Sequence, residues 1–141
     1  MKKFELTSET KINIFGKKLF RIKALISFGN VEAGETGGWV EKEENVNQSG
    51  DAWVSGNAMV YGNAEVSGNA DYTTIRGFGT QFRTTTFFRC KDKQVKVSCG
   101  CFYGTIPEFR EQVKNTRKGK IAEEYLMIAD LMEKHFAEEA K

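Results

Sequence analysis

The chain has 141 residues, of which 40% are hydrophobic and 28% are charged. This composition is typical of one globular domain with a buried core and excludes a disordered or membrane-spanning protein. The 21 Lys and Arg residues against 19 Asp and Glu residues leave a formal net charge of +2, too small to indicate nucleic-acid binding by charge alone. Three cysteines, and the lack of an apolar run after Met1, favour a reduced cytoplasmic protein without a membrane anchor.

Residues 1–49 are predicted to form an N-terminal β region. Apolar and polar residues alternate on both sides of the turn Phe15-Gly16-Lys17, which predicts two antiparallel strands between residues 3 and 27. Several glycines follow, and they predict a loop with one short strand at Trp39-Val40. The acidic residues of this loop, Glu41 among them, are interpreted as a solvated surface.

Residues 50–83 carry a hexapeptide repeat, which reads GDAWVS, GNAMVY, GNAEVS and GNADY between residues 50 and 72. The period predicts a short left-handed β-helix, with Val pointing inward, Ala near a corner and Gly-Asn in the turn. Trp53, Met59, Tyr61 and Glu65 are expected on the outside. Because a coil needs roughly 18 residues, the repeat makes little more than one turn and must be capped. Residues 73–83 are expected to be a loop or a last irregular coil.

Residues 84–104 are predicted to form a β-hairpin, because residues 84–90 are rich in β-branched and aromatic types and residues 95–102 alternate. A turn at residues 91–94 that pairs Lys91 with Gln94 places Cys90 opposite Val95. In this register one largely apolar face carries all three cysteines.

Residues 105–141 are predicted to form a helical tail of two helices. Thr105, Pro107 and Glu108 provide a capping box and a first-turn proline for the first helix. The second helix, from about residue 121 to residue 138, has an apolar stripe that includes Leu131 and His135 and is wide enough to face two neighbours. This stripe and the truncated coil favour a homo-oligomer.

The expected fold is therefore a single domain, residues 1–141, that is mainly β with C-terminal α structure. A short left-handed β-helix is flanked by β-hairpins and followed by two helices.

Candidate catalytic and metal-ligating residues are few. Cys99 and Cys101 lie about 7 Å apart on an extended strand, whereas zinc needs four ligands around one point. We therefore predict no metal or other cofactor, and interpret the cysteines as buried thiols. An acyltransferase of the hexapeptide class would have to use His135, the single histidine, as its general base. A histidine at the end of a terminal helix is typical of a packing or helix-terminal residue, so no enzymatic activity is predicted.

A group of arginines and phenylalanines is the predicted binding site for a ligand or partner. Guanidinium groups and aromatic rings, beside the hydroxyls of residues 84–86, are groups that hold a phosphate and stack a base. The alternative interpretation is a set of solvated strand and loop surfaces. The candidate residues are Arg76, Phe82, Arg83 and Arg89.

Three segments and the repeat between them form a recognisable pattern. They read LFRIKAL (residues 19–25), GGWVEKEENV (residues 37–46) and CGCFYGTI (residues 99–106), around the GNA repeats. This pattern resembles a family of small phage and prophage proteins that share such a head and tail around a variable number of hexapeptide repeats. The resemblance covers nearly the whole chain, supplies no catalytic residues, and implies a spacer or binding surface.

The resemblance implies a non-enzymatic phage accessory protein of the host cytoplasm that inhibits bacterial defence by binding. Such a protein would block a CRISPR effector or another defence protein, or sequester a nucleotide signal. Two alternatives are a structural protein that self-assembles through its β-helix and a degenerate hexapeptide acyltransferase.

Overall fold

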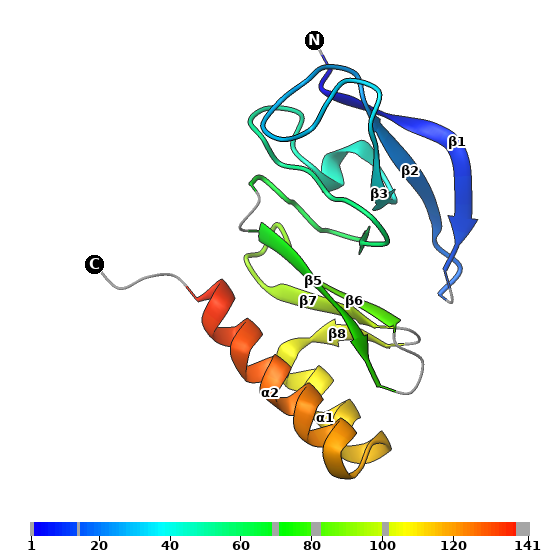
Figure 1. Cartoon of the computed structure of the whole chain (residues 1–141). Coiled ribbons are helices and arrows are strands. Elements are labelled where there is room, and N and C mark those ends of the chain that lie inside the picture. The colour runs from blue at the N-terminus through cyan, green and yellow to red at the C-terminus, as the bar shows by residue number, and fades with distance from the viewer. Residues whose placement is uncertain (1, 14, 69–70, 80–82, 100–101, 138–141) are drawn as a thin grey trace.

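The computed structural model describes residues 2–13, 15–68, 71–79, 83–99 and 102–137. These residues form two four-stranded β-sheets followed by two helices, so the expectation of a mainly β fold with C-terminal α structure is confirmed. The first sheet and its loops lie at the N-terminal end of the molecule, the second sheet lies beside them, and the helices pack on its far side (Figure 1). Neither helix in this described part combines the length and apolar character needed to cross a membrane.

The first sheet has the strand order β1-β2-β3-β4. Strands β1 (Phe4–Ile12) and β2 (Lys18–Ala24) form the predicted antiparallel hairpin, and β3 (Thr36–Val40) contains the predicted short strand and pairs antiparallel with β2. The two-residue strand β4 (Met59–Val60) comes from the repeat and pairs parallel with β3. A 3-10 turn, η1 (Glu43–Asn45), lies between β3 and the repeat.

The repeat buries its periodic positions as predicted. The described inward Val and Ala residues have no exposed surface, and they are Val54, Val60, Val66, Ala52, Ala58 and Ala64. Parallel pairing joins Trp39 to Met59, Val40 to Val60 and Val46 to Val66. Each partner lies 20 residues later in the chain, so segments 20 residues apart lie side by side in parallel.

Two of the residues expected on the outside of the repeat are buried instead. Trp53 is 5% exposed and packs edge-on against the rings of Phe4 and Phe28. Tyr61 is 2% exposed, packs against Phe88 of the second sheet and donates its hydroxyl hydrogen bond to Ser98 at 3.1 Å. The expectation of a free outer surface is wrong at both positions because the β1–β2 hairpin and the second sheet cover this part of the repeat.

The second sheet has the strand order β5-β6-β7-β8. Its strands are β5 (Tyr72–Phe78), β6 (Arg83–Arg89), β7 (Val95–Cys99) and β8 (Phe102–Thr105), and each pairs antiparallel with the next. The expectation of a loop or irregular coil over residues 73–83 is wrong for residues 73–78, which belong to β5, and for Arg83, which begins β6. Residues 80–82 lie outside the described residues. The β-branched residues Thr73, Thr74 and Ile75 suit this strand, although the nearby glycines obscure the pattern.

The β6–β7 hairpin differs by one residue from the predicted register. The Cys90 backbone N–H donates to the carbonyl of Gln94 at 2.8 Å, so three residues form the loop, and Lys93 adopts φ 71°. Three-residue hairpin loops place a residue in this left-handed region. As a result Phe88 faces Lys96, whereas the predicted register paired Phe88 with Val97.

A one-residue shift moves side chains to the opposite face of a strand pair. Cys90 is buried in the core beneath the repeat, whereas Cys99 is only partly buried and packs against the core beneath the helices. The expectation that one face carries all three cysteines is therefore wrong for these two, and Cys101 lies outside the described residues. Both faces of β6 are buried at its centre, with Phe88 toward the repeat and Phe87 toward the helices.

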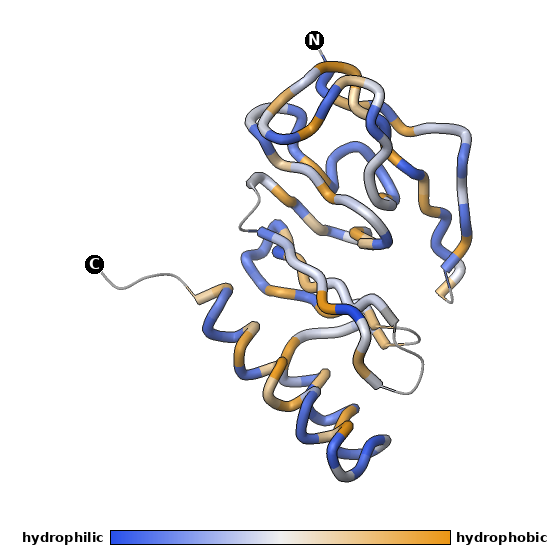
Figure 2. Tube along the Cα trace, viewed as in Figure 1, coloured by the Kyte–Doolittle hydropathy of each residue, from blue (hydrophilic) through white to orange (hydrophobic). Residues whose placement is uncertain are grey.

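The helices are α1 (Ile106–Thr116) and α2 (Gly119–Phe136). The predicted capping box is confirmed, since the Glu108 N–H donates to the Thr105 hydroxyl at 3.3 Å and the Glu108 carboxylate accepts the Thr105 N–H at 2.8 Å. Polar and apolar residues alternate along α2 (Figure 2). Its buried residues are Tyr125, Ile128, Ala129, Met132 and Phe136. His135 and Leu131 are exposed, so the buried face is narrower than predicted.

Candidate functional site

The predicted arginine and phenylalanine residues do not all come together. Phe82 and the side chain of Arg83 lie outside the described part of the structure. Arg76 is exposed on β5 and pairs with Thr84, while Arg89 lies five residues further along β6, about 17 Å away along the strand. Because side chains alternate between faces, Arg76 and Arg89 also lie on opposite faces of the sheet.

Arg89 is held by three contacts near the end of α2. Its Nε donates to Oδ1 of Asp71 at 3.1 Å, and its Nη2 donates to the backbone carbonyl of Phe136 at 3.0 Å. The guanidinium group also lies 5.5 Å from the centre of the Phe136 ring. Asp71 in turn accepts backbone N–H groups of Ser67 and Gly68 through Oδ2. Arg89 thus connects the end of the repeat to the helical layer.

A cleft of about 520 Å³ opens beside Arg89, between the β6–β7 turn, the start of α1 and the end of α2. We call it the Arg89 cleft. Its apolar lining comes from Val95, Ile106, Pro107, Phe136 and Ala137. Its polar lining comes from Arg89, Lys93, Gln94, Thr105 and Glu133. A mostly apolar cleft with a few polar groups at its margin is the usual form of a binding site.

The charges of the Arg89 cleft are only partly neutralised. The Glu133 carboxylate pairs with Arg110 at 3.1 Å, and Arg89 pairs with Asp71. Lys93 is exposed in the turn and forms no ion pair among the described residues. The cleft therefore offers an apolar wall next to a free ammonium group, which suits an apolar ligand segment that carries a carboxylate.

Neither Cys90 nor Cys99 lines this cleft. Burial raises the pKa of the Cys90 thiol to about 11, and the charge of Asp92 adds to the effect. Cys90 is therefore protonated at neutral pH, and only a thiolate is a strong nucleophile. The Cys99 sulfur accepts a hydrogen bond from the Thr85 hydroxyl at 3.1 Å. Among the described residues, no group of three or more His, Cys, Asp or Glu side chains is placed to hold a metal ion.

His135, the residue on which an acyltransferase would depend, is exposed near the end of α2. Its ring packs edge-on against Phe136 with 5.1 Å between ring centres. It does not line the Arg89 cleft.

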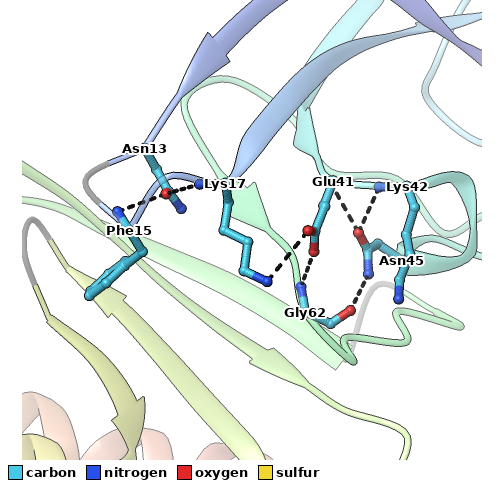
Figure 3. Close-up of polar contacts among 7 residues, drawn as sticks. All are labelled: Asn13, Phe15, Lys17, Glu41, Lys42, Asn45 and Gly62. Atoms are coloured by element: carbon cyan, nitrogen blue, oxygen red, sulfur yellow. Dashed lines mark hydrogen bonds and ion pairs between the residues drawn. The ribbon is translucent and has the colours of Figure 1, made fainter.

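Sequence reasoning missed a polar network that joins the β1–β2 hairpin to the repeat (Figure 3). Asn45 is fully buried; its Oδ1 accepts the N–H groups of Glu41 and Lys42, and its Nδ2 donates to the carbonyls of Gly62 and Ala64. The Glu41 carboxylate accepts the Gly62 N–H at 2.9 Å and lies 3.5 Å from the Lys17 ammonium group. The interpretation of Glu41 as a merely solvated residue is therefore wrong, since only the folded chain supplies these partners.

Lys3 is a second buried polar residue without a signal in the sequence. It is 2% exposed, and its ammonium group donates to the carbonyls of Ala52 at 2.6 Å and Gly50 at 3.2 Å. It also lies 4.6 Å from the centre of the Phe28 ring. Burial lowers the pKa of Lys3. These contacts attach the start of β1 to the first repeat, so the role of Lys3 is structural.

Neither a protein-family model nor a curated protein matches the chain. The fold and the Arg89 cleft define a mainly β protein whose second sheet separates a repeat-containing layer from a helical layer.

Proposed function

We propose that the protein is a non-enzymatic binding protein whose partner docks in the Arg89 cleft. The observation that carries this proposal is the combination of an apolar lining with the unpaired ammonium group of Lys93 at one place on the surface. Apolar contacts supply affinity in such a site, and the charge orients the ligand.

The partner is a protein segment rather than a nucleotide. Arg89 already pairs with Asp71, and Arg76 lies on the other face of the sheet. The predicted phosphate site depended on guanidinium groups that converge on one phosphate, and these two do not converge. An apolar segment with an acidic side chain or a terminal carboxylate fits the cleft better.

The biological role in this proposal is inhibition of bacterial defence by a phage accessory protein in the host cytoplasm, through binding of a CRISPR effector or another defence protein. Its support is the sequence pattern around the hexapeptide repeats. The scaffold in the proposal is a short left-handed β-helix, supported by the six-residue period and by the parallel pairing of segments 20 residues apart.

Self-assembly of coils end to end is a weaker candidate because the second sheet covers the last described part of the repeat. Ala64 bridges to Cys90, the Glu65 N–H donates to the Arg89 carbonyl, and the Lys91 N–H donates to the Asn63 carbonyl. These backbone groups are therefore not free to pair with another coil.

The test is a panel of bacterial strains, each with one defence system, in which phage plating is measured with and without the protein. We expect wild type to raise plating against at least one system. Lys93→Glu and Ala137→Arg, which reverse the free charge and fill the cleft, should abolish the gain. Lys91→Glu is the matched control, since Lys91 is exposed in the same turn but does not line the cleft.

Circular dichroism and thermal unfolding establish that the variants fold. If wild type raises plating against no system, the anti-defence role is refuted. If folded Lys93→Glu and Ala137→Arg proteins act like wild type, the Arg89 cleft is not the docking site.

A further inference from the structure

The outer face of α2 exposes two large apolar side chains. Met127 is 70% exposed and Leu131 is 56% exposed, and residues four apart lie next to each other along one side of a helix. The opposite side of α2 supplies the buried residues of the helical core. The helix lies at the outside of the molecule (Figure 1), so this apolar pair has no cover from the described part of the chain.

Charged residues flank the apolar pair with opposite signs. Glu123 and Glu124 precede Met127 by four and three residues, and the cation Lys134 and the imidazole of His135 follow Leu131 by three and four residues. The spacing is therefore symmetric about the midpoint between Met127 and Leu131. We call these six residues the outer α2 stripe.

The charges of this stripe are available for a partner. Glu123, Glu124 and Lys134 form no ion pair among the described residues, whereas the neighbouring carboxylates of Asp130 and Glu133 both pair with Arg110. The Arg110 contacts are 2.8 Å and 3.1 Å long. Arg110 thus offsets part of the acidic charge of α2 next to the stripe, and the stripe itself has an acidic end and a basic end.

We propose that the outer α2 stripe binds a second copy of the chain in antiparallel orientation. A two-fold axis near the midpoint places Met127 of each copy against Leu131 of the other, and Glu124 of each copy against Lys134 of the other. A two-fold interface requires a surface that is complementary to itself, and this charge order meets that requirement. A parallel arrangement would place Glu124 against Glu124 and Lys134 against Lys134.

The resulting dimer is weak and depends on concentration. One pair of crossing helices buries less surface than the roughly 1,200–2,000 Å² of a standard stable interface. We therefore expect a dissociation constant on the order of 10 μM. The inference does not depend on the Arg89 cleft, because dimerisation is measured with the purified chain alone.

The first test is sedimentation velocity on the purified full-length chain from low micromolar to near-millimolar concentration. Wild type should shift from monomer to dimer, and Leu131→Glu should stay monomeric. Ile12→Glu is the matched control, since Ile12 is a 71% exposed apolar residue outside α2, and this variant should dimerise like wild type. A wild type that stays monomeric throughout, or a Leu131→Glu protein that still dimerises, would overturn the proposal.

The second test examines the antiparallel orientation by charge exchange. In a homodimer of either Glu124→Lys or Lys134→Glu, the side chains at positions 124 and 134 carry the same charge at both symmetry-related contacts. Each variant should therefore dimerise about tenfold more weakly than wild type. An equimolar mixture of the two variants pairs opposite charges at both contacts and should dimerise like wild type. A mixture no more associated than its components would refute the antiparallel arrangement.

Discussion

Replacement of Gly38 by Ala tests how closely the repeat packs against β3. A Cβ atom at Gly38 would lie 2.8 Å from the carbonyl oxygen of Ala58 and 3.3 Å from that of Ser55. The Ala58 carbonyl also accepts the Trp39 N–H at 2.9 Å, so the added methyl group would push apart two hydrogen-bonded backbone segments. The φ angle of Gly38 is not in the left-handed region, and the effect is therefore steric.

The expected loss of stability follows from these distances. Overpacking in a rigid environment costs about 1–3 kcal/mol, and backbone atoms cannot move aside as a flexible side chain can. Alanine also lowers the conformational entropy of the unfolded chain relative to glycine, which stabilises the folded state by about 0.4–1 kcal/mol. A net destabilisation of about 1–2 kcal/mol should lower the melting temperature by roughly 3–8 °C for a chain of this length.

Gly37→Ala should be at least as damaging, because a Cβ atom there would lie 2.5 Å from the Val54 carbonyl oxygen and 2.6 Å from the Trp53 ring. Gly68→Ala is the matched control, since Gly68 lies in the same repeat region with open space around it and no left-handed φ. Thermal and urea unfolding measure all three variants. If Gly38→Ala unfolds at the same temperature as Gly68→Ala, the close approach of the repeat to β3 is wrong.

Three further predictions concern charged and polar side chains. Arg89→Glu should lower the free energy of unfolding by about 2 kcal/mol or more, because it places a carboxylate beside Asp71. Arg76→Glu is the control at an exposed position and should change the free energy of unfolding by less than about 0.5 kcal/mol. Equal urea midpoints for the two variants would refute the structural role of Arg89. The pKa of Cys90 rises from 9.0 to about 11 on folding, so the unfolded state loses this proton first, and the thiol's contribution to stability is complete below pH 9 and is lost between pH 9 and 11. In urea unfolding across that range, the free energy of unfolding should fall less steeply with pH for Cys90→Ala than for wild type. Equal slopes for the two proteins would contradict the shift. Asn45→Asp should lower the free energy of unfolding by about 3 kcal/mol at neutral pH, because its carboxylate would face two backbone carbonyls. Part of this stability should be regained at acidic pH, where a protonated carboxyl group can donate a hydrogen bond. A loss of stability that is the same at pH 7 and pH 4 would show that charge is not its cause.

Local and periodic patterns in the sequence were sufficient for several elements. The alternation around Gly16 predicts the β1–β2 hairpin, and the six-residue period predicts the buried Val54, Val60 and Val66. The signal from Thr105 to Glu108 predicts the start of α1. Each of these features depends on residues close together in the chain, so composition and spacing contain the information needed.

The hairpin register and strand β5 show where such patterns fail. A two-residue and a three-residue loop are both compatible with the turn sequence, and the choice moves Cys90 and Cys99 to opposite cores. Lys93 in the left-handed region gives no signal because that position usually favours glycine. Strand β5 depends on its pairing with β6, and that pairing is a contact between separate segments.

The candidate site was predicted only in part for the same reason. The sequence identifies Arg89 as a candidate, but its ion pair with Asp71 and its separation from Arg76 come from the pairing of β5 with β6. The cleft beside it comes from the packing of α2 against the second sheet. Period and composition determine which side chains turn inward from a strand, coil or helix. Long-range packing decides which outward side chains are covered, because the burial of one element's outer face depends on apolar surface supplied by another. It buries Trp53 and Tyr61 but leaves Met127 and Leu131 exposed.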